Sequence, residues 1–144
     1  MASGRCFTLR QAAIAMTRRR VLLAEDDADI RALLAWAMRH DGFDVVEAED
    51  GAQLLERLDE ARSGGEDDLL PDVIVTDIRM PRVNGLEVLE RLKREGVGVP
   101  VLVVTAHGDA LTVRRAERLG AAAVLLKPID LDDFLTAVLH YAVH

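Results

Sequence analysis

The sequence is poor in the residues that several classes of site require. A single cysteine, Cys6, in 144 residues leaves no internal disulfide bond and excludes zinc sites built from cysteine ligands. Aromatic residues make up 3% of the chain, which argues against a surface that stacks on nucleic-acid bases. No apolar run approaches the roughly 18 to 20 residues that a membrane-spanning helix requires. We therefore expect a protein of a reducing, cytoplasmic compartment that binds neither membranes nor nucleic acids directly.

Charge is distributed unevenly along the chain. The formal net charge of −7 at pH 7 is unfavourable for a nucleic-acid groove. Five arginines nevertheless precede the first acidic residue, Glu25. Hydrophobic residues make up 50% of the chain, enough for one globular domain with a substantial core. We expect residues 1–18 to form a disordered basic extension and residues 19–144 to form the domain.

Strand and helix patterns alternate from residue 20 to the end of the chain. Short apolar or alternating segments predict five strands. These strands are expected at residues 20–25, 43–48, 72–76, 101–104 and 122–126. Helical spacing of apolar residues follows each of them, as in the series that begins with Ile30 and Leu33. Asp27 and Asn84 stand where helix N-caps are expected, and Asp50 and Gly51 are expected to start the second helix.

The alternation predicts an α/β fold of five strand–helix units. Strands joined through helices must be parallel, and the crossovers are right-handed. Five such units form a (βα)₅ doubly wound parallel five-stranded sheet, most simply in the flavodoxin-like order 2-1-3-4-5 with helices on both faces. In this order the carboxyl ends of strands 1, 3, 4 and 5 line one crevice, where such three-layer sandwiches bind their ligands.

Charged residues follow three of these strands. Glu25, Asp26 and Asp27 come after the first strand, Asp77 after the third and Lys127 after the fifth. Because the carboxyl ends of parallel strands share an edge, these groups are expected to converge. Two like charges about 4 Å apart repel by roughly 4 kcal/mol at an effective dielectric near 20, so the acids either raise each other's pKa or recruit a cation. Oxygen ligands of this kind suit Mg²⁺ or Mn²⁺.

The same crevice is suited to phosphoryl transfer. Asp77 lies on the central strand, between the acidic pair and the lysine, and is the candidate nucleophile that would form an acyl phosphate. Lys127 would neutralise a phosphoryl oxygen as a compact cation. The Thr105 hydroxyl and the Ala106 N–H, at the end of the fourth strand, could donate hydrogen bonds to the other oxygens. The backbone carbonyl of Arg79 could complete the metal site.

Five motifs occur along the chain in a fixed order. They are VLLAEDD at 21–27, VTDIRMP at 75–81, NG at 84–85, VVTA at 103–106 and KP at 127–128. Together they resemble the signature of response regulator receiver domains, the CheY-like family. The resemblance covers about residues 19–142, nearly the whole chain, and implies a single-domain response regulator with the fold described above.

The resemblance also implies a role for each residue of the crevice. Asp77 would be the phosphorylated aspartate, and Glu25 and Asp26 the acids of the magnesium site. Thr105 would be the switch hydroxyl and Lys127 the phosphate-binding lysine, joined to the next residue by a cis peptide bond. The phosphoryl donor would be a phosphohistidine on a sensor histidine kinase or on a histidine phosphotransfer protein.

Three positions depart from the usual pattern of that family. Val124 occupies the place in the fifth strand where the family usually carries an aromatic residue or histidine that swings inward on activation. Output is then expected to rely on loop and backbone shifts. Arg79, two residues after Asp77, and His107, two after Thr105, are unusual there, and the resemblance implies that both tune the lifetime of the phosphoryl group.

The leading hypothesis is a signalling switch that is not a turnover enzyme. Phosphorylation replaces one negative charge with about two and biases an equilibrium between two conformers. The expected readout face comprises the helix near 109–119, the strand at 122–126 and the last helix, which begins at Leu131. Its partner would be a separate downstream protein, or a second copy of the chain in a phosphorylation-dependent homodimer.

Other interpretations fit the residues less well. A haloacid-dehalogenase-like phosphatase also uses a nucleophilic aspartate after a strand, but needs a second acid where this chain has Arg79. A flavodoxin-like cofactor site would place a phosphate against Glu25, Asp26 and Asp27, which would repel it. A receiver-like domain independent of phosphorylation is a further option, although every expected site residue is present. Glu25 and Asp26 alone could be ordinary helix N-terminal acids.

Overall fold

Strands and helices alternate throughout the part of the chain that the computed structural model describes, residues 19–64, 70–106 and 108–143. The expected basic extension at residues 1–18 lies outside these residues. The strands are β1 (Arg20–Ala24), β2 (Asp44–Ala48), β3 (Val73–Thr76), β4 (Val101–Thr105) and β5 (Ala123–Leu126). The helices are α2 (Ala28–His40), α3 (Gly51–Ser63), α4 (Gly85–Arg94), α5 (Ala110–Arg118) and α6 (Leu131–Val143). Among the helices described, none is long and apolar enough to cross a bilayer.

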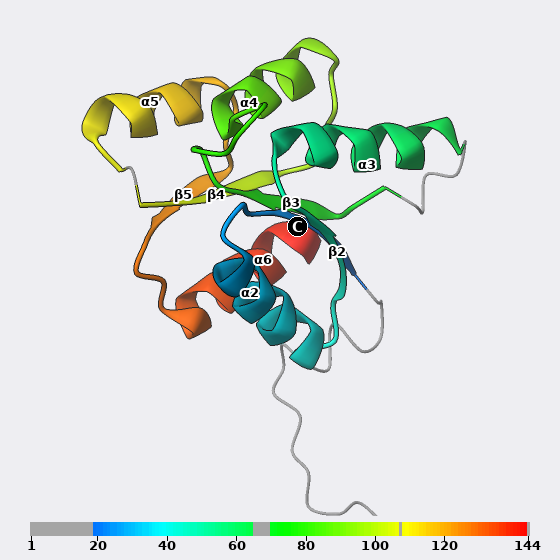
Figure 1. Cartoon of the computed structure of the whole chain (residues 1–144), viewed down its shortest axis with the longest axis vertical. Coiled ribbons are helices and arrows are strands. Elements are labelled where there is room, and N and C mark those ends of the chain that lie inside the picture. The colour runs from blue at the N-terminus through cyan, green and yellow to red at the C-terminus, as the bar shows by residue number, and fades with distance from the viewer. Residues whose placement is uncertain (1–18, 65–69, 107, 144) are drawn as a thin grey trace, which may run out of the picture.

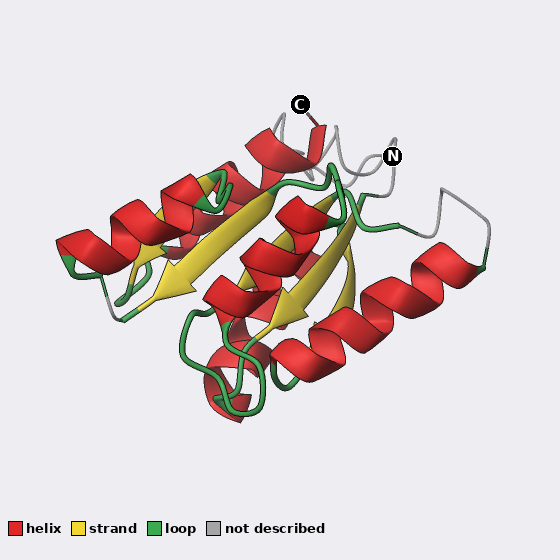
Figure 2. Cartoon of the chain, turned by 90° about the horizontal axis from the view of Figure 1, so that it is seen from above, coloured by secondary structure: helices red, strands yellow, loops and turns green. Residues whose placement is uncertain are grey.

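The five strands form one parallel sheet in the order β2-β1-β3-β4-β5, which confirms the predicted topology (Figure 2). Its register aligns the ends of the strands that carry charged residues. Ala24, just before Glu25, pairs with Thr76, the last residue of β3. Thr105, the last residue of β4, pairs with Leu126, just before Lys127. The sheet therefore brings Glu25, Asp77, Thr105 and Lys127 to one edge.

Helices cover both faces of the sheet and bury its apolar residues. Figure 1 shows α2 and α6 on one face and α3, α4 and α5 on the other. The two central strands β3 and β4 are buried along their whole length, because each packs against helices on both sides. The first core cluster includes Leu23, Met38, Val75, Leu102 and Phe134. The second includes Leu22, Leu54, Ile74, Leu89 and Val103.

Side-chain caps begin the helices close to the carboxyl ends of the strands. Asp27 accepts hydrogen bonds from the N–H groups of Asp29 and Ile30, 2.9 and 3.1 Å away. Asp50 caps α3 in the same way, and Asn84 forms a capping box with Glu87 at the start of α4. The caps predicted at Asp27 and Asn84 are thus confirmed, as is the helix start predicted at Asp50 and Gly51.

The loop after β3 turns back sharply and brings α4 against the end of the strand. The Gly85 N–H donates to the carbonyl oxygen of Ile78 over 2.7 Å. A Cβ atom on Gly85 would lie 2.2 Å from the carbonyl oxygen of Asp77, so any larger residue must push the backbone apart. The position of α4 is therefore tied to that of Asp77.

Replacing Gly85 with alanine is expected to displace α4 from the end of β3. Overpacking of this kind should lower the free energy of unfolding by about 1–3 kcal/mol. Gly98→Ala is the matched control, because a Cβ there meets nothing within 4 Å, and its stability should stay within about 1 kcal/mol of the parent. Urea unfolding of the three proteins tests this. Equal stability of both variants would show that the close approach at Gly85 is unimportant.

Candidate functional site

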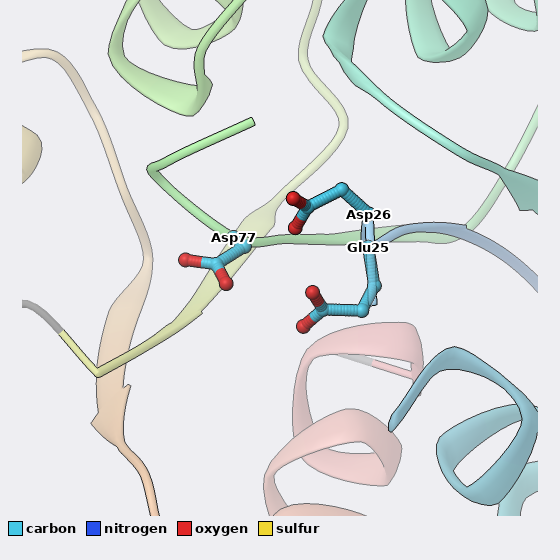
Figure 3. Close-up of side chains that lie close together, drawn as sticks. All are labelled: Glu25, Asp26 and Asp77. Atoms are coloured by element: carbon cyan, nitrogen blue, oxygen red, sulfur yellow. The ribbon is translucent and has the colours of Figure 1, made fainter. Parts of the chain in front are cut away.

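Three carboxylates from two strands meet at the carboxyl edge of the sheet. Glu25 and Asp26 lie directly after β1, and Asp77 lies directly after β3. Figure 3 shows the three side chains close together, and one oxygen of each lies within 4.8 Å of the others. Glu25 and Asp77 are buried, whereas Asp26 is exposed. The structure therefore brings together the acids that the sequence suggested would converge.

Lys127 completes the cluster from the end of β5. Its Nζ atom donates to Glu25 Oε1 over 2.7 Å and to Asp77 Oδ2 over 2.8 Å. The backbone N–H of Lys127 donates to the carbonyl oxygen of Thr105, which holds the residue against β4. The peptide bond to Pro128 is cis, as the family resemblance implied. One ammonium group thus serves as the counter-charge for two carboxylates.

Burial and charge pairing act in opposite directions at this cluster. Burial raises the pKa of Glu25 above its usual range, although the hydrogen bond from Lys127 opposes this effect. Burial disfavours the ammonium of Lys127, but its hydrogen bonds to Asp77 and Glu25 prevail and raise the pKa of the lysine. The lysine therefore stays charged at neutral pH, while the charged form of Glu25 is held at a cost in stability.

Backbone donors orient the two buried carboxylates. The Ile78 N–H donates to Asp77 Oδ1 over 2.6 Å, and the Asp27 N–H donates to Glu25 Oε2 over 3.1 Å. Arg31, on the first turns of α2, donates from Nη1 to the carbonyl oxygen of Glu25 over 2.7 Å. The sequence did not single out Arg31, because it lies within an ordinary amphipathic helix pattern and its contact with Glu25 is to a backbone atom.

The structure describes four of the other predicted site residues. Thr105 is buried at the end of β4, and Ala106 follows it at the surface. The side chain of Arg79 is exposed. Val124 is half-buried and packs against the cluster between the sheet and α3, α4 and α5. His107 lies outside the described residues.

The donor set fits a small divalent cation. Three carboxylate oxygens lie close enough to share one ion, and no sulfur ligand competes among them. Such hard oxygen ligands suit Mg²⁺, which keeps several of its waters and takes few carboxylates. Glu25, Asp26 and Asp77 could therefore hold the ion, which would offset negative charge on an incoming anion.

Comparison with known proteins assigns the chain to a family. Residues 21–139 match the response regulator receiver domain. The chain belongs to this family. It is 35% identical over 121 residues to the transcriptional regulatory protein PdtaR of Mycobacterium tuberculosis, covering 83% of this chain but 55% of that protein. The chain thus spans about half the length of PdtaR.

Two further proteins match along most of their length. The sporulation initiation phosphotransferase F of Bacillus subtilis is 29% identical over 126 residues, covering 88% of this chain and 95% of that protein. A response regulator receiver domain from Clostridium thermocellum superposes with a TM-score of 0.73 at 26% identity, covering 87% of this chain and 94% of the other. The chain is therefore a phosphoacceptor module of two-component signalling rather than a turnover enzyme, and the phosphatase alternative is set aside.

The raised pKa of Glu25 predicts a gain of stability for Glu25→Gln without divalent cations. A carboxyl group whose pKa is higher in the folded protein contributes stability below its ordinary pKa and loses it as the pH rises through the folded value. The amide cannot ionise, so the variant should be more stable than the parent at pH 7. The difference should vanish below the ordinary value of 4.5.

Urea unfolding in EDTA at pH 7 and at pH 4 measures this difference. A variant that is less stable than the parent at pH 7 would contradict the electrostatic description of the cluster.

Proposed function

We propose that Asp77 accepts a phosphoryl group and that Glu25, Asp26 and the backbone carbonyl of Arg79 hold Mg²⁺ or Mn²⁺ beside it. The observation that carries this proposal is the 2.8 Å contact between Lys127 Nζ and Asp77 Oδ2. It places a fixed positive charge at the oxygen atoms to which a phosphoryl group would be attached. Membership of the receiver family supports the same assignment.

In this proposal one carboxylate oxygen of Asp77 attacks the phosphorus of a phosphohistidine. A P–O bond forms as the P–N bond breaks, and the imidazole leaves. Lys127 neutralises one phosphoryl oxygen, while the Thr105 hydroxyl and the Ala106 N–H donate to the others. The small side chain of Ala106 leaves room for the group. The bound cation would add positive charge at the same oxygens.

Phosphorylation of Asp77 would change the ion pairs that Lys127 makes. Its ammonium is shared between Glu25 and Asp77 before the reaction. The phosphorylated side chain carries about two negative charges and draws the ammonium toward itself, which weakens its hold on Glu25. Movement at the end of β5 and at Thr105 would then alter the surface formed by α5, β5 and α6.

Loose packing of α5 supports this surface as the readout. Ala116 is the one fully buried residue of that helix. Since Val124 carries no aromatic ring, we propose that loop and backbone shifts transmit the change. Arg79 and His107 remain candidates for tuning the phosphoryl lifetime.

The proposed partners follow from the family and from one relative. The donor is a sensor histidine kinase or a histidine phosphotransfer protein in the cytoplasm, and the target is a separate downstream protein or a second copy of this chain. The Bacillus subtilis relative, named a phosphotransferase, is matched over 95% of its length, which supports a single-domain intermediate of a phosphorelay. Residues 19–144 would form that domain, preceded by a basic extension.

Acetyl phosphate provides a direct test, because it donates a phosphoryl group without a partner protein. Incubation with Mg²⁺ should add one phosphoryl group per chain by intact mass, and EDTA should prevent the addition. Asp77→Asn should take up none, whereas Asp59→Asn, on α3, should react like the parent. Phosphorylation of the Asp77→Asn variant, or of the parent in EDTA, would contradict the proposal.

A further inference from the structure

The loop between β3 and α4, residues 78–84, is closed at its base beside Asp77. The Gly85 N–H donates to the Ile78 carbonyl, and the Thr76 hydroxyl donates to the carbonyl oxygen of Asp77 over 2.9 Å. Gly85 leaves no free space against Asp77. The base of this loop is therefore in direct contact with the Asp77 backbone.

The outer part of the loop contains a backbone conformation that needs support. Arg82 has a φ of 68°, and it is the one non-glycine residue with a positive φ among the residues described. Its Cβ makes this left-handed conformation unfavourable, and neither asparagine nor glycine stands there to ease it. Such conformations persist where surrounding contacts hold them.

The start of α3 supplies those contacts. Arg82 donates from Nε to Asp50 Oδ2 over 2.8 Å and from Nη2 to Asp50 Oδ1 over 3.1 Å. Next to this pair, the Gly51 N–H donates to the Val83 carbonyl over 3.1 Å. A Cβ on Gly51 would lie 2.1 Å from that oxygen, so the two backbones are in direct contact. In Figure 1 this loop, which precedes α4, lies beside the first turn of α3.

Asp50 is a rigid anchor for the guanidinium group. Its side chain is 8% exposed, whereas that of Arg82 is 57% exposed. The carboxylate also accepts a hydrogen bond from the Gln53 N–H over 2.9 Å, which fixes it as the cap of α3. The bidentate pair with Arg82 lowers the pKa of Asp50, so the carboxylate is ionised at neutral pH.

From these contacts we propose that Arg82 is a positioning residue for phosphoryl transfer. Its ion pair with Asp50 holds the loop that follows Asp77. The Arg79 carbonyl and the Asp77 carboxylate thereby keep their places in the metal and phosphoryl site. The inference rests on the proposed function of Asp77. In the contacts described, Arg82 touches none of the three carboxylates of the candidate metal site, so its effect passes through the loop backbone. The guanidinium of Arg82 is largely exposed, and ion pairs with an exposed partner usually add little stability, so we assign this pair a role in loop geometry.

Two substitutions remove the ion pair between Arg82 and Asp50 without adding backbone strain. Arg82→Gly removes the guanidinium but suits the left-handed backbone, so this variant should fold with a stability close to that of the parent. Asp50→Asn keeps an N-cap but removes the anionic partner. Arg62→Ala is the matched control, because it removes another exposed arginine, paired with Glu95 over 2.6 Å, away from the loop.

The experiment measures Mg²⁺ affinity by calorimetry and the rate of phosphorylation by acetyl phosphate at saturating Mg²⁺. Both Arg82→Gly and Asp50→Asn should weaken Mg²⁺ binding and slow phosphorylation by about tenfold, within the roughly hundredfold that a misplaced reacting group can cost. The double variant should be no slower than Arg82→Gly alone, since both changes break one interaction. Arg62→Ala should match the parent in both measurements.

Parent values of both quantities in Arg82→Gly, or equal losses in Arg62→Ala, would overturn the proposal. Urea unfolding of each variant shows whether a loss arises from a general loss of folding. A parent protein that accepts no phosphoryl group would instead refute the proposed function. In that case the Mg²⁺ affinities alone would test the positioning role. An affinity of Arg82→Gly equal to that of the parent would contradict that role.

Discussion

The ammonium group of Lys127 is the counter-charge that lets the two buried acids of the crevice lie side by side. It contacts Glu25 and Asp77, which come from two other strands, at 2.7 and 2.8 Å. Without a counter-charge, buried carboxylates this close would repel or take up protons. The sheet order and register put the three strand ends side by side, and the cis peptide bond follows the lysine. The rest of the site is arranged around this contact.

This arrangement favours function over stability. Burial raises the pKa of Glu25, so the folded chain holds a charge that water would accommodate better. Burial of the apolar residues on both faces of β3 and β4 stabilises the fold and offsets the cost of this buried charge. Conflict between local chemistry and the overall fold is expected at a functional site, where a charge that is unfavourable at rest can be relieved by a ligand.

Sequence patterns predicted most of the fold and the convergence of the site. Buried strands follow from short apolar runs, and the caps at Asp27 and Asn84 from residue types that compete for helix ends. The ion pair between Asp50 and Arg82 could not be predicted, because it depends on a left-handed loop residue for which arginine carries no signal. The contact from Arg31 to the Glu25 carbonyl was missed because any residue offers a backbone acceptor.

The coupling between Lys127 and Glu25 can be measured most directly by following the Glu25 side-chain carboxyl carbon by NMR as the pH changes, in the parent and in Lys127→Ala. The hydrogen bond from Lys127 lowers the pKa of Glu25, while burial raises it. The account predicts that the parent Glu25 titrates above its ordinary value of 4.5 and that removing the lysine moves the titration still higher. An identical titration in both proteins would contradict it.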